Sequence, residues 1–262
     1  MPEVSKMKKP DVKLVLLGDM NVGKTSLLHR YTERKFKDTI STVGGAFFLK
    51  QWGPYNISIW DTAGREQFHG LGSMYCRGAA AVILTYDVTN WQSLAELEER
   101  FLSLTDTANH NCIYALVGNK ADLTDPKAQL PQDSDPSKDQ TECGVERTDT
   151  QVLSACPTPP ASPASLSGIT LQKQVTPEDA MALYGRILRY KGLDEKSSLP
   201  AEKMCFETSA KTGYNVDDLF EALFDLVLPS ILRNRNESQQ SPTVDLEECR
   251  GAGNKRAKSG CC

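Results

Sequence analysis

The segment from Gly18 to Thr25 reads Gly-Asp-Met-Asn-Val-Gly-Lys-Thr, which fits the phosphate-binding pattern of two glycines, a lysine and a hydroxyl residue at fixed spacing. Backbone N–H groups of such a loop, and of the helix that follows it, can surround a phosphate. Lys24 can reach the outer phosphate oxygens, and the hydroxyl of Thr25 can ligate Mg²⁺. The predicted phosphate-side contacts are Gly18, Asp19, Met20, Asn21, Val22, Gly23, Lys24, Thr25 and Ser26.

A second motif, Asn119-Lys120-Ala121-Asp122, follows the apolar run 113–118. Ligands of open α/β sheets bind at the carboxyl ends of the strands, so this motif should lie beside the phosphate loop. The carboxylate of Asp122 can accept two N–H bonds from the edge of guanine, which adenine cannot supply. The two motifs together predict a guanine-nucleotide site and disfavour an ATP-using kinase.

Alternating strand-type and helix-type runs surround these motifs from Asp11 to Gly118, which is typical of a largely parallel sheet flanked by helices. A further strand at 46–52 turns back at Gly53-Pro54, so the predicted sheet is mixed. The strands dense in branched apolar residues are 12–17, 57–60, 80–86 and 113–117, with a last strand near 204–208.

The segment 124–174 is crowded with Pro, Ser, Thr, Asp and Gln, and we predict a disordered insertion there. Thr176 then offers a hydroxyl cap before Pro177, which predicts a helix towards Tyr190, and Asn215 is expected to cap the final helix. The predicted organisation is a flexible N-terminus (1–10), one domain (11–232) interrupted by the insertion (124–174), and a polar, irregular tail (233–262).

Five segments carry a known order and spacing: the phosphate loop, Ser41-Thr42-Val43-Gly44, Trp60-Asp61-Thr62-Ala63-Gly64, Asn119-Lys120-Ala121-Asp122 and Glu207-Thr208-Ser209-Ala210-Lys211. Together they resemble the Ras superfamily and, within it, the Rab family of membrane-traffic GTPases. The likeness covers 11–123, 175–232 and the extreme C-terminus. The sequences of Gly44–Leu49, Arg65–Ala81 and Lys203–Leu226 resemble the Rab-twenty subfamily. The resemblance implies a P-loop small-GTPase fold of α/β class, with a mostly parallel six-stranded sheet, one antiparallel strand and flanking helices.

By resemblance, Thr42 in the nucleotide-dependent segment 36–47, called switch I, contacts Mg²⁺ and the γ-phosphate. Asp61 holds the metal through water, and the Gly64 N–H contacts the γ-phosphate. The cofactor implied is therefore Mg²⁺, with Thr25, Thr42 and Asp61 as its ligands. Lys24, Thr42 and Gly64 are the implied catalytic residues. The remaining base-side contacts implied by the family are Phe36, Asn119, Lys120, Asp122, Ser209, Ala210 and Lys211.

The chain departs from the family where most Rabs carry a water-orienting glutamine, because Arg65 follows Gly64 and the glutamine stands two positions later, at Gln67. A guanidinium has donors only, so Arg65 can stabilise charge without accepting a proton from water. Met20 is bulky where small residues are usual. We therefore hypothesise slow intrinsic hydrolysis, unless Gln67 or a backbone shift compensates. Ala46 also replaces an acidic residue, which predicts unusual partner contacts at switch I.

The chain ends in a basic stretch followed by Cys261 and Cys262, which resembles the doubly geranylgeranylated ends of Rabs. Two lipids are needed because one short chain binds a membrane only reversibly. The resemblance implies a prenylation escort, a GDP-dissociation inhibitor, an exchange factor, a GTPase-activating protein and effectors. It places the protein on the cytoplasmic face of endomembranes (Golgi, endosome or phagosome), with an extracted cytosolic pool.

Composition narrows the function classes further. A net charge of -4 gives no global attraction to nucleic acid, so we expect no nucleic-acid partner. We also expect a monomer. No secretory signal opens the chain, and its longest apolar run, 79–86, is far short of the ~20 residues of a transmembrane helix. The leading function is a GTP/GDP switch that hydrolyses GTP, and its rival is a GTP-loaded scaffold controlled by exchange or extraction.

Overall fold

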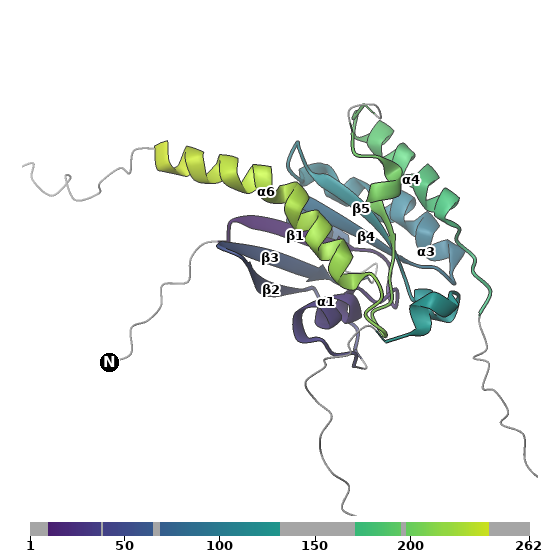
Figure 1. The fold of residues 1–262 in the computed structure, drawn as a ribbon. Coiled ribbons are helices and arrows are strands. Elements are labelled where there is room, and N and C mark those ends of the chain that lie inside the picture. The colour runs from purple at the N-terminus through teal and green to yellow at the C-terminus, as the bar shows by residue number, and fades with distance from the viewer. Residues whose placement is uncertain (1–9, 38, 65–68, 132–170, 195–197, 241–262) are drawn as a thin grey trace, which may run out of the picture.

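The computed structural model describes residues 10–37, 39–64, 69–131, 171–194 and 198–240, which form helices around a six-stranded sheet (Figure 1). The strand order is β2-β3-β1-β4-β5-β6, and only the β2–β3 pair is antiparallel. This confirms the predicted mixed sheet. The strands are β1 Val12–Leu17, β2 Gly45–Trp52, β3 Tyr55–Thr62, β4 Ala81–Asp87, β5 Ile113–Asn119 and β6 Cys205–Glu207.

Strand burial follows position in the sheet. Every residue of the central strand β4 is buried, as its branched apolar sequence predicts, whereas the edge strand β2 alternates between exposed and half-buried residues. The register pairs Leu16 with Asp61 and Gly118 with Glu207. The carboxyl ends of the parallel strands therefore meet at one edge of the sheet, where both sequence motifs are brought together.

Helices cover both faces of the sheet (Figure 1). Helices α1 and α6 lie against one face, and α2, α3 and α4 lie on the other. Helix α3 continues as the π-helical turn η2 Leu97–Phe101 and the 3₁₀ turn η3 Ser103–Thr107. The helices are α1 Lys24–Glu33, α2 His69–Cys76, α3 Trp91–Glu96, α4 Pro177–Tyr190, α5 Ala201–Met204 and α6 Val216–Gln240.

The start of α4 is confirmed as the sequence predicts. The Thr176 hydroxyl accepts a bond from the Asp179 backbone N–H, the Asp179 carboxylate accepts from the Thr176 N–H, and Pro177 occupies the first helical position. This capping box satisfies helix donors that would otherwise be unpaired.

The predicted disorder of 124–174 is wrong at both of its ends. The 3₁₀ turn η5 Pro126–Gln129 is capped by Asp125 and buries Ala128. On the other side, the N–H of Leu171 donates to the Leu123 carbonyl at 2.8 Å. Polar composition concealed this order, because Leu171 bonds to a residue far away in the sequence and η5 is held by the side-chain cap of Asp125. Residues 132–170 lie outside the described residues.

The final helix also runs further than predicted, because the expected irregular tail from Arg233 is helical through Gln240. No Pro or Gly interrupts 233–240, so an existing helix can propagate there at little cost. Pro229 lies inside the helix rather than ending it. Asn215 precedes the helix with a left-handed φ of 54°, and its side-chain amide donates to the Glu207 carbonyl.

An aromatic cluster joins α6 to α1 and to the tip of the β2–β3 hairpin. Phe220 stacks on Tyr31 with ring centroids 4.1 Å apart, and Phe224 lies 5.6 Å from Trp52. The indole N–H of Trp52 donates to the carboxylate of Glu221 at 2.8 Å. Burial of such rings is a large stabilising contribution, and these contacts fix α6 against the sheet.

Candidate nucleotide site

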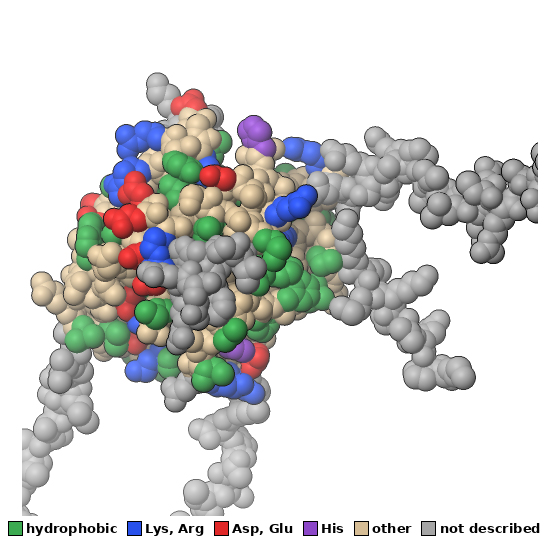
Figure 2. Space-filling model, turned by 180° about the vertical axis from the view of Figure 1, so that it is seen from behind, with side chains coloured by type: hydrophobic (Ala, Val, Ile, Leu, Met, Phe, Trp, Pro, Cys, Tyr) green, Lys and Arg blue, Asp and Glu red, His purple; other side chains and the backbone are tan. Residues whose placement is uncertain are grey.

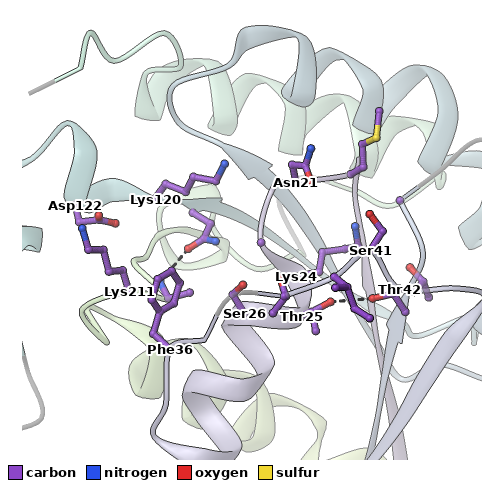
Figure 3. Close-up of a pocket in the computed structure, with 18 of the residues that line it drawn as sticks. Asn21, Lys24, Thr25, Ser26, Phe36, Ser41, Thr42, Lys120, Asp122 and Lys211 are labelled. Carbon is purple, nitrogen blue, oxygen red and sulfur yellow. Dashed lines mark hydrogen bonds between the residues drawn. The ribbon is translucent and has the colours of Figure 1, made fainter.

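A cavity of about 300 Å³ lies at the carboxyl edge of the sheet, where loops from separate parts of the chain converge (Figure 3). Thr39, Ile40, Ser41, Thr62 and Leu123 also line it, although sequence reasoning did not select them. The predicted residues that line it are Met20, Asn21, Gly23, Lys24, Thr25, Ser26, Phe36, Thr42, Gly64, Asn119, Lys120, Asp122, Ala210 and Lys211.

Lys24 is the first residue of α1, near the end of the phosphate-binding segment 18–25. Its ammonium group donates to the carbonyls of Gly18 at 2.7 Å and Asp19 at 2.8 Å, and the residue is only 6% exposed. Burial lowers the pKa of Lys24 to about 8, while the charges of Asp61 and Asp19 act in the opposite direction. A buried cation of this kind is stabilised by an anion at its side, such as a phosphate.

Two glycines show how tightly the loop is packed. Gly23 has a φ of 96°, and a Cβ there would lie 2.3 Å from the amide nitrogen of Asn119. A Cβ on Gly64 would lie 2.4 Å from the Met20 nitrogen and 2.5 Å from the Asp19 carbonyl carbon. Gly64 therefore packs directly against the phosphate loop. This contact is required of a residue that binds a phosphate held by the loop.

Three oxygen-bearing side chains meet beside Lys24. The Thr25 hydroxyl lies 3.0 Å from that of Thr42 and donates to Asp61 Oδ2 at 2.6 Å, and Thr42 lies 3.2 Å from the same oxygen. Asp61 is fully buried, and within the described residues its Oδ1 has no hydrogen-bond partner. Burial raises the pKa of Asp61, against the lowering effects of Thr25, Lys24 and Thr42. Hard oxygen donors around an unsatisfied buried carboxylate suit Mg²⁺.

The opposite end of the cavity holds the predicted base contacts, where Figure 3 shows Phe36, Lys120, Asp122 and Lys211. Asp122 Oδ1 accepts a bond from the Ser209 hydroxyl at 2.6 Å, which orients the carboxylate. Phe36 is half-exposed, so one side of its ring is open to a ligand. A planar base with N–H donors on one edge matches this end.

Asn119 joins the base end to the phosphate end. Its side-chain amide donates to the Val22 carbonyl at 2.9 Å, and its Oδ1 accepts from the Ala210 N–H at 3.1 Å. Lys120, in the left-handed conformation, forms an ion pair with Asp87 at 2.6 Å. Asn119 thus links the phosphate loop to the segment 208–211 by hydrogen bonds.

Arg30 is a site residue that sequence reasoning missed. It is 8% exposed, and its guanidinium donates to the carbonyls of Ala210, at 2.8 Å, and Lys211. Nothing near Arg30 in the sequence signals this role, because its partners lie about 180 positions away. The arginine supports the base loop from the side of α1.

Two groups of predicted residues lie outside the described part of the chain. These are Arg65 and Gln67, which follow Gly64, and the terminal pair Cys261 and Cys262. Within the described residues, no helix is long and apolar enough to cross a membrane.

Comparison with known proteins agrees with the geometry of the cavity. A model of the Ras family matches residues 13–228. Ras-related protein Rab-20 of Mus musculus is 60% identical over 258 residues, and that of Homo sapiens is 60% identical over 256, each covering 98% of this chain and 100% of the relative. Ras-related protein Rab5 of Nicotiana tabacum is 46% identical over 122 residues, which cover 45% of this chain and 61% of that protein. The similarity to the Rab-20 proteins thus extends over nearly the whole chain.

Proposed function

The chain belongs to the Ras family and is a Rab small GTPase of the Rab-20 type, and from that premise we propose that it is a membrane-bound GTP/GDP switch in vesicle trafficking. As a GTPase it converts GTP to GDP and phosphate. The observation that carries the proposal is the single cavity in which Lys24, the oxygens around Asp61 and the carboxylate of Asp122 converge.

The side chains divide the work of binding along the cavity. Lys24 supplies a buried positive charge for the outer phosphates, and Asp122, held by Ser209, accepts from the base. Thr25, Thr42 and Asp61 would hold Mg²⁺, which when bound neutralises phosphate charge. Small-GTPase catalysis rests mainly on such positioning and electrostatic stabilisation, because the protein has little covalent chemistry to perform.

The geometry also supports a switch. Thr42 lies just before β2 and Asp61 lies in β3, and these two antiparallel strands pair Ala46 with Asp61. The Ala63 N–H donates to the Gly44 carbonyl at 2.9 Å, so the two segments that reach the γ-phosphate side are hydrogen-bonded to each other. Loss of the γ-phosphate would release both, as in other nucleotide switches.

Effectors would bind beside these segments. Phe47 is 46% exposed and Leu49 43% exposed on the edge strand β2, and Met74 of α2 is also exposed. Figure 2 shows further hydrophobic side chains at the surface beside the grey segments that the structure does not describe. Exposed apolar residues on an ordered face are typical of protein-binding surfaces.

We further propose that intrinsic hydrolysis is slow, because Arg65 replaces the water-orienting glutamine and Met20, half-exposed, lines the cavity. Single-turnover hydrolysis with Mg²⁺ tests this on the wild type and on Arg65→Gln. We expect a slow wild type and a gain of at least about tenfold on substitution, or 1.4 kcal/mol of barrier. A normal Rab-like rate in the wild type, or no gain, would refute it.

The rival function is a GTP-loaded scaffold that hardly hydrolyses and is controlled by exchange or extraction. Met20 and Arg65 favour it, because both weaken the step that ends the active state. The nucleotide extracted from protein isolated from cells separates the two. Mostly GDP supports the hydrolysing switch, and mostly GTP supports the scaffold.

We also propose that geranylgeranylated Cys261 and Cys262 attach the protein to a membrane. The membrane would be that of the Golgi, an endosome or a phagosome, and a GDP-dissociation inhibitor would extract the protein from it. The support for this attachment is the terminal cysteine pair behind a Rab domain. Prenylation of the full chain in vitro, followed by flotation with anionic vesicles, tests it. The Cys261→Ser/Cys262→Ser variant should remain unbound, and equal flotation of both proteins would overturn this assignment.

A further inference from the structure

Arg100, in the turn that continues α3, contacts the phosphate loop at Asp19. It lies in the π-helical turn η2, and its Nη1 forms ion pairs with Glu96 at 2.8 Å and with Asp19 at 3.5 Å. The side chains of all three residues are between 16% and 23% exposed. Such partly buried pairs are less screened by solvent than pairs at the surface.

Asp19 touches the two residues that would hold the outer phosphates. Its main-chain carbonyl accepts a bond from the Lys24 ammonium at 2.8 Å. Its carbonyl carbon and oxygen lie 2.5 and 2.7 Å from the point where Gly64 would carry a Cβ. A rotation of the Asp19 peptide therefore moves an acceptor of Lys24 and the surface that supports Gly64 at the same time.

The turn that carries Arg100 is itself irregular. Helix α3 ends at Glu96 and continues as a π-helical turn, a geometry that is rare and occurs often at functional sites. Phe101 is buried next to it, and the guanidinium carbon of Arg100 lies 5.3 Å from the Phe101 ring centroid. The ring and Glu96 restrict the arginine, so its charge is held towards Asp19.

We propose that Arg100 is a positioning residue of the nucleotide site, which acts through Asp19 on Lys24 and Gly64. This proposal rests on the proposed binding of GTP in the cavity. By family resemblance the Gly64 N–H would contact the γ-phosphate, which GDP lacks, so loss of the Arg100 charge should weaken GTP binding more than GDP binding. The ratio of the two dissociation constants is thus the informative quantity.

The test compares Arg100→Gln with Arg186→Gln in the full chain. Arg186 forms an ion pair with Glu98 of the same turn at 2.9 Å, and among the described contacts neither residue pairs with Asp19, so Arg186 is the control. Dissociation constants are measured for GDP and for a non-hydrolysable GTP analogue at saturating Mg²⁺. We expect Arg100→Gln to raise the GTP-analogue/GDP ratio by about threefold to tenfold. Arg186→Gln should leave it unchanged.

A second variant separates positioning from general destabilisation. Asp19→Asn removes the same ion pair from the other side, so combining it with Arg100→Gln should add little to either single effect. Phosphorus NMR of the bound analogue should show a shift change in Arg100→Gln that Arg100→Lys largely restores. A purely structural role would lower the unfolding temperature without changing the ratio.

The outcomes are distinct. An unchanged ratio in Arg100→Gln, or an equal change in Arg186→Gln, overturns the role of Arg100 and leaves the GTP site intact. Failure of the wild-type chain to bind either guanine nucleotide overturns the proposed function itself. A selective rise of the ratio with a non-additive double variant supports the inference.

Discussion

Replacing Arg30 by methionine should accelerate nucleotide release. The change removes the guanidinium and keeps most of the apolar stem, so it deletes the bonds to the carbonyls of Ala210 and Lys211 with little loss of packing. Each hydrogen bond from a charged group contributes ~1.5–3 kcal/mol, so the folded, nucleotide-bound protein should lose about 3 kcal/mol. If half of this loss falls on the base loop, GDP should dissociate roughly tenfold faster.

The assay is displacement of a fluorescent GDP by excess unlabelled GDP with Mg²⁺, combined with urea unfolding at one fixed GDP concentration, since bound ligand contributes to stability. Arg34→Gln is the control. Arg34 also lies at the end of α1, but its exposed ion pair with Asp217 should contribute less than about 1 kcal/mol. A release rate for Arg30→Met within twofold of the wild type, despite a clear loss of stability, would refute the argument that Arg30 supports the base loop.

Three further results are expected. Asp122→Asn should weaken GTP binding by roughly 100-fold and improve xanthosine triphosphate binding, because the carboxylate that accepts from the base becomes partly a donor; competition binding checks this. Glu221→Gln should lower the free energy of unfolding by about 1 kcal/mol, since one acceptor bonded to Trp52 is weakened; urea unfolding measures it. Burial raises the pKa of Cys76 and Cys112 from 9.0 to about 12. The folded thiols keep their protons while unfolded thiols lose them, so stability should be full below pH 9 and fall between pH 9 and 12, less steeply in Cys76→Ala.

The phosphate and base motifs could be predicted because their chemistry depends on residues that are close in sequence. Gly23 and Lys24 must be adjacent for one loop to surround a phosphate, and Asn119 and Asp122 must follow one strand. The capping box of Thr176 and Asp179 is equally local. Strand burial made the sheet predictable for the same reason, since each run carries its own apolar pattern.

The remaining features depend on contacts between distant residues. The bonds from Arg30 to the base loop and from Arg100 to Asp19 leave no periodic or compositional signal. The ordered edges of the insertion are bonded to distant residues, by the Leu171 N–H to the Leu123 carbonyl and by the Thr212 hydroxyl to the Ala128 carbonyl, which polar sequence does not reveal. The sequence prediction ends α6 too early because an existing helix needs no new nucleation step and extends by one backbone bond per residue into a polar segment without Pro or Gly.

The length of α6 has a mechanical consequence. Among the residues of α6 whose burial is described, the last buried one is Ile231, and the helix continues to Gln240, about 13 Å further along its axis at 1.5 Å per residue. A pull on the end of this helix would be transmitted along its axis to Phe224 and from the Phe224 ring to Trp52, at the tip of the β2–β3 hairpin. Force from an anchored tail would therefore arrive at the same hairpin whose other end carries Thr62 and Gly45, beside the nucleotide.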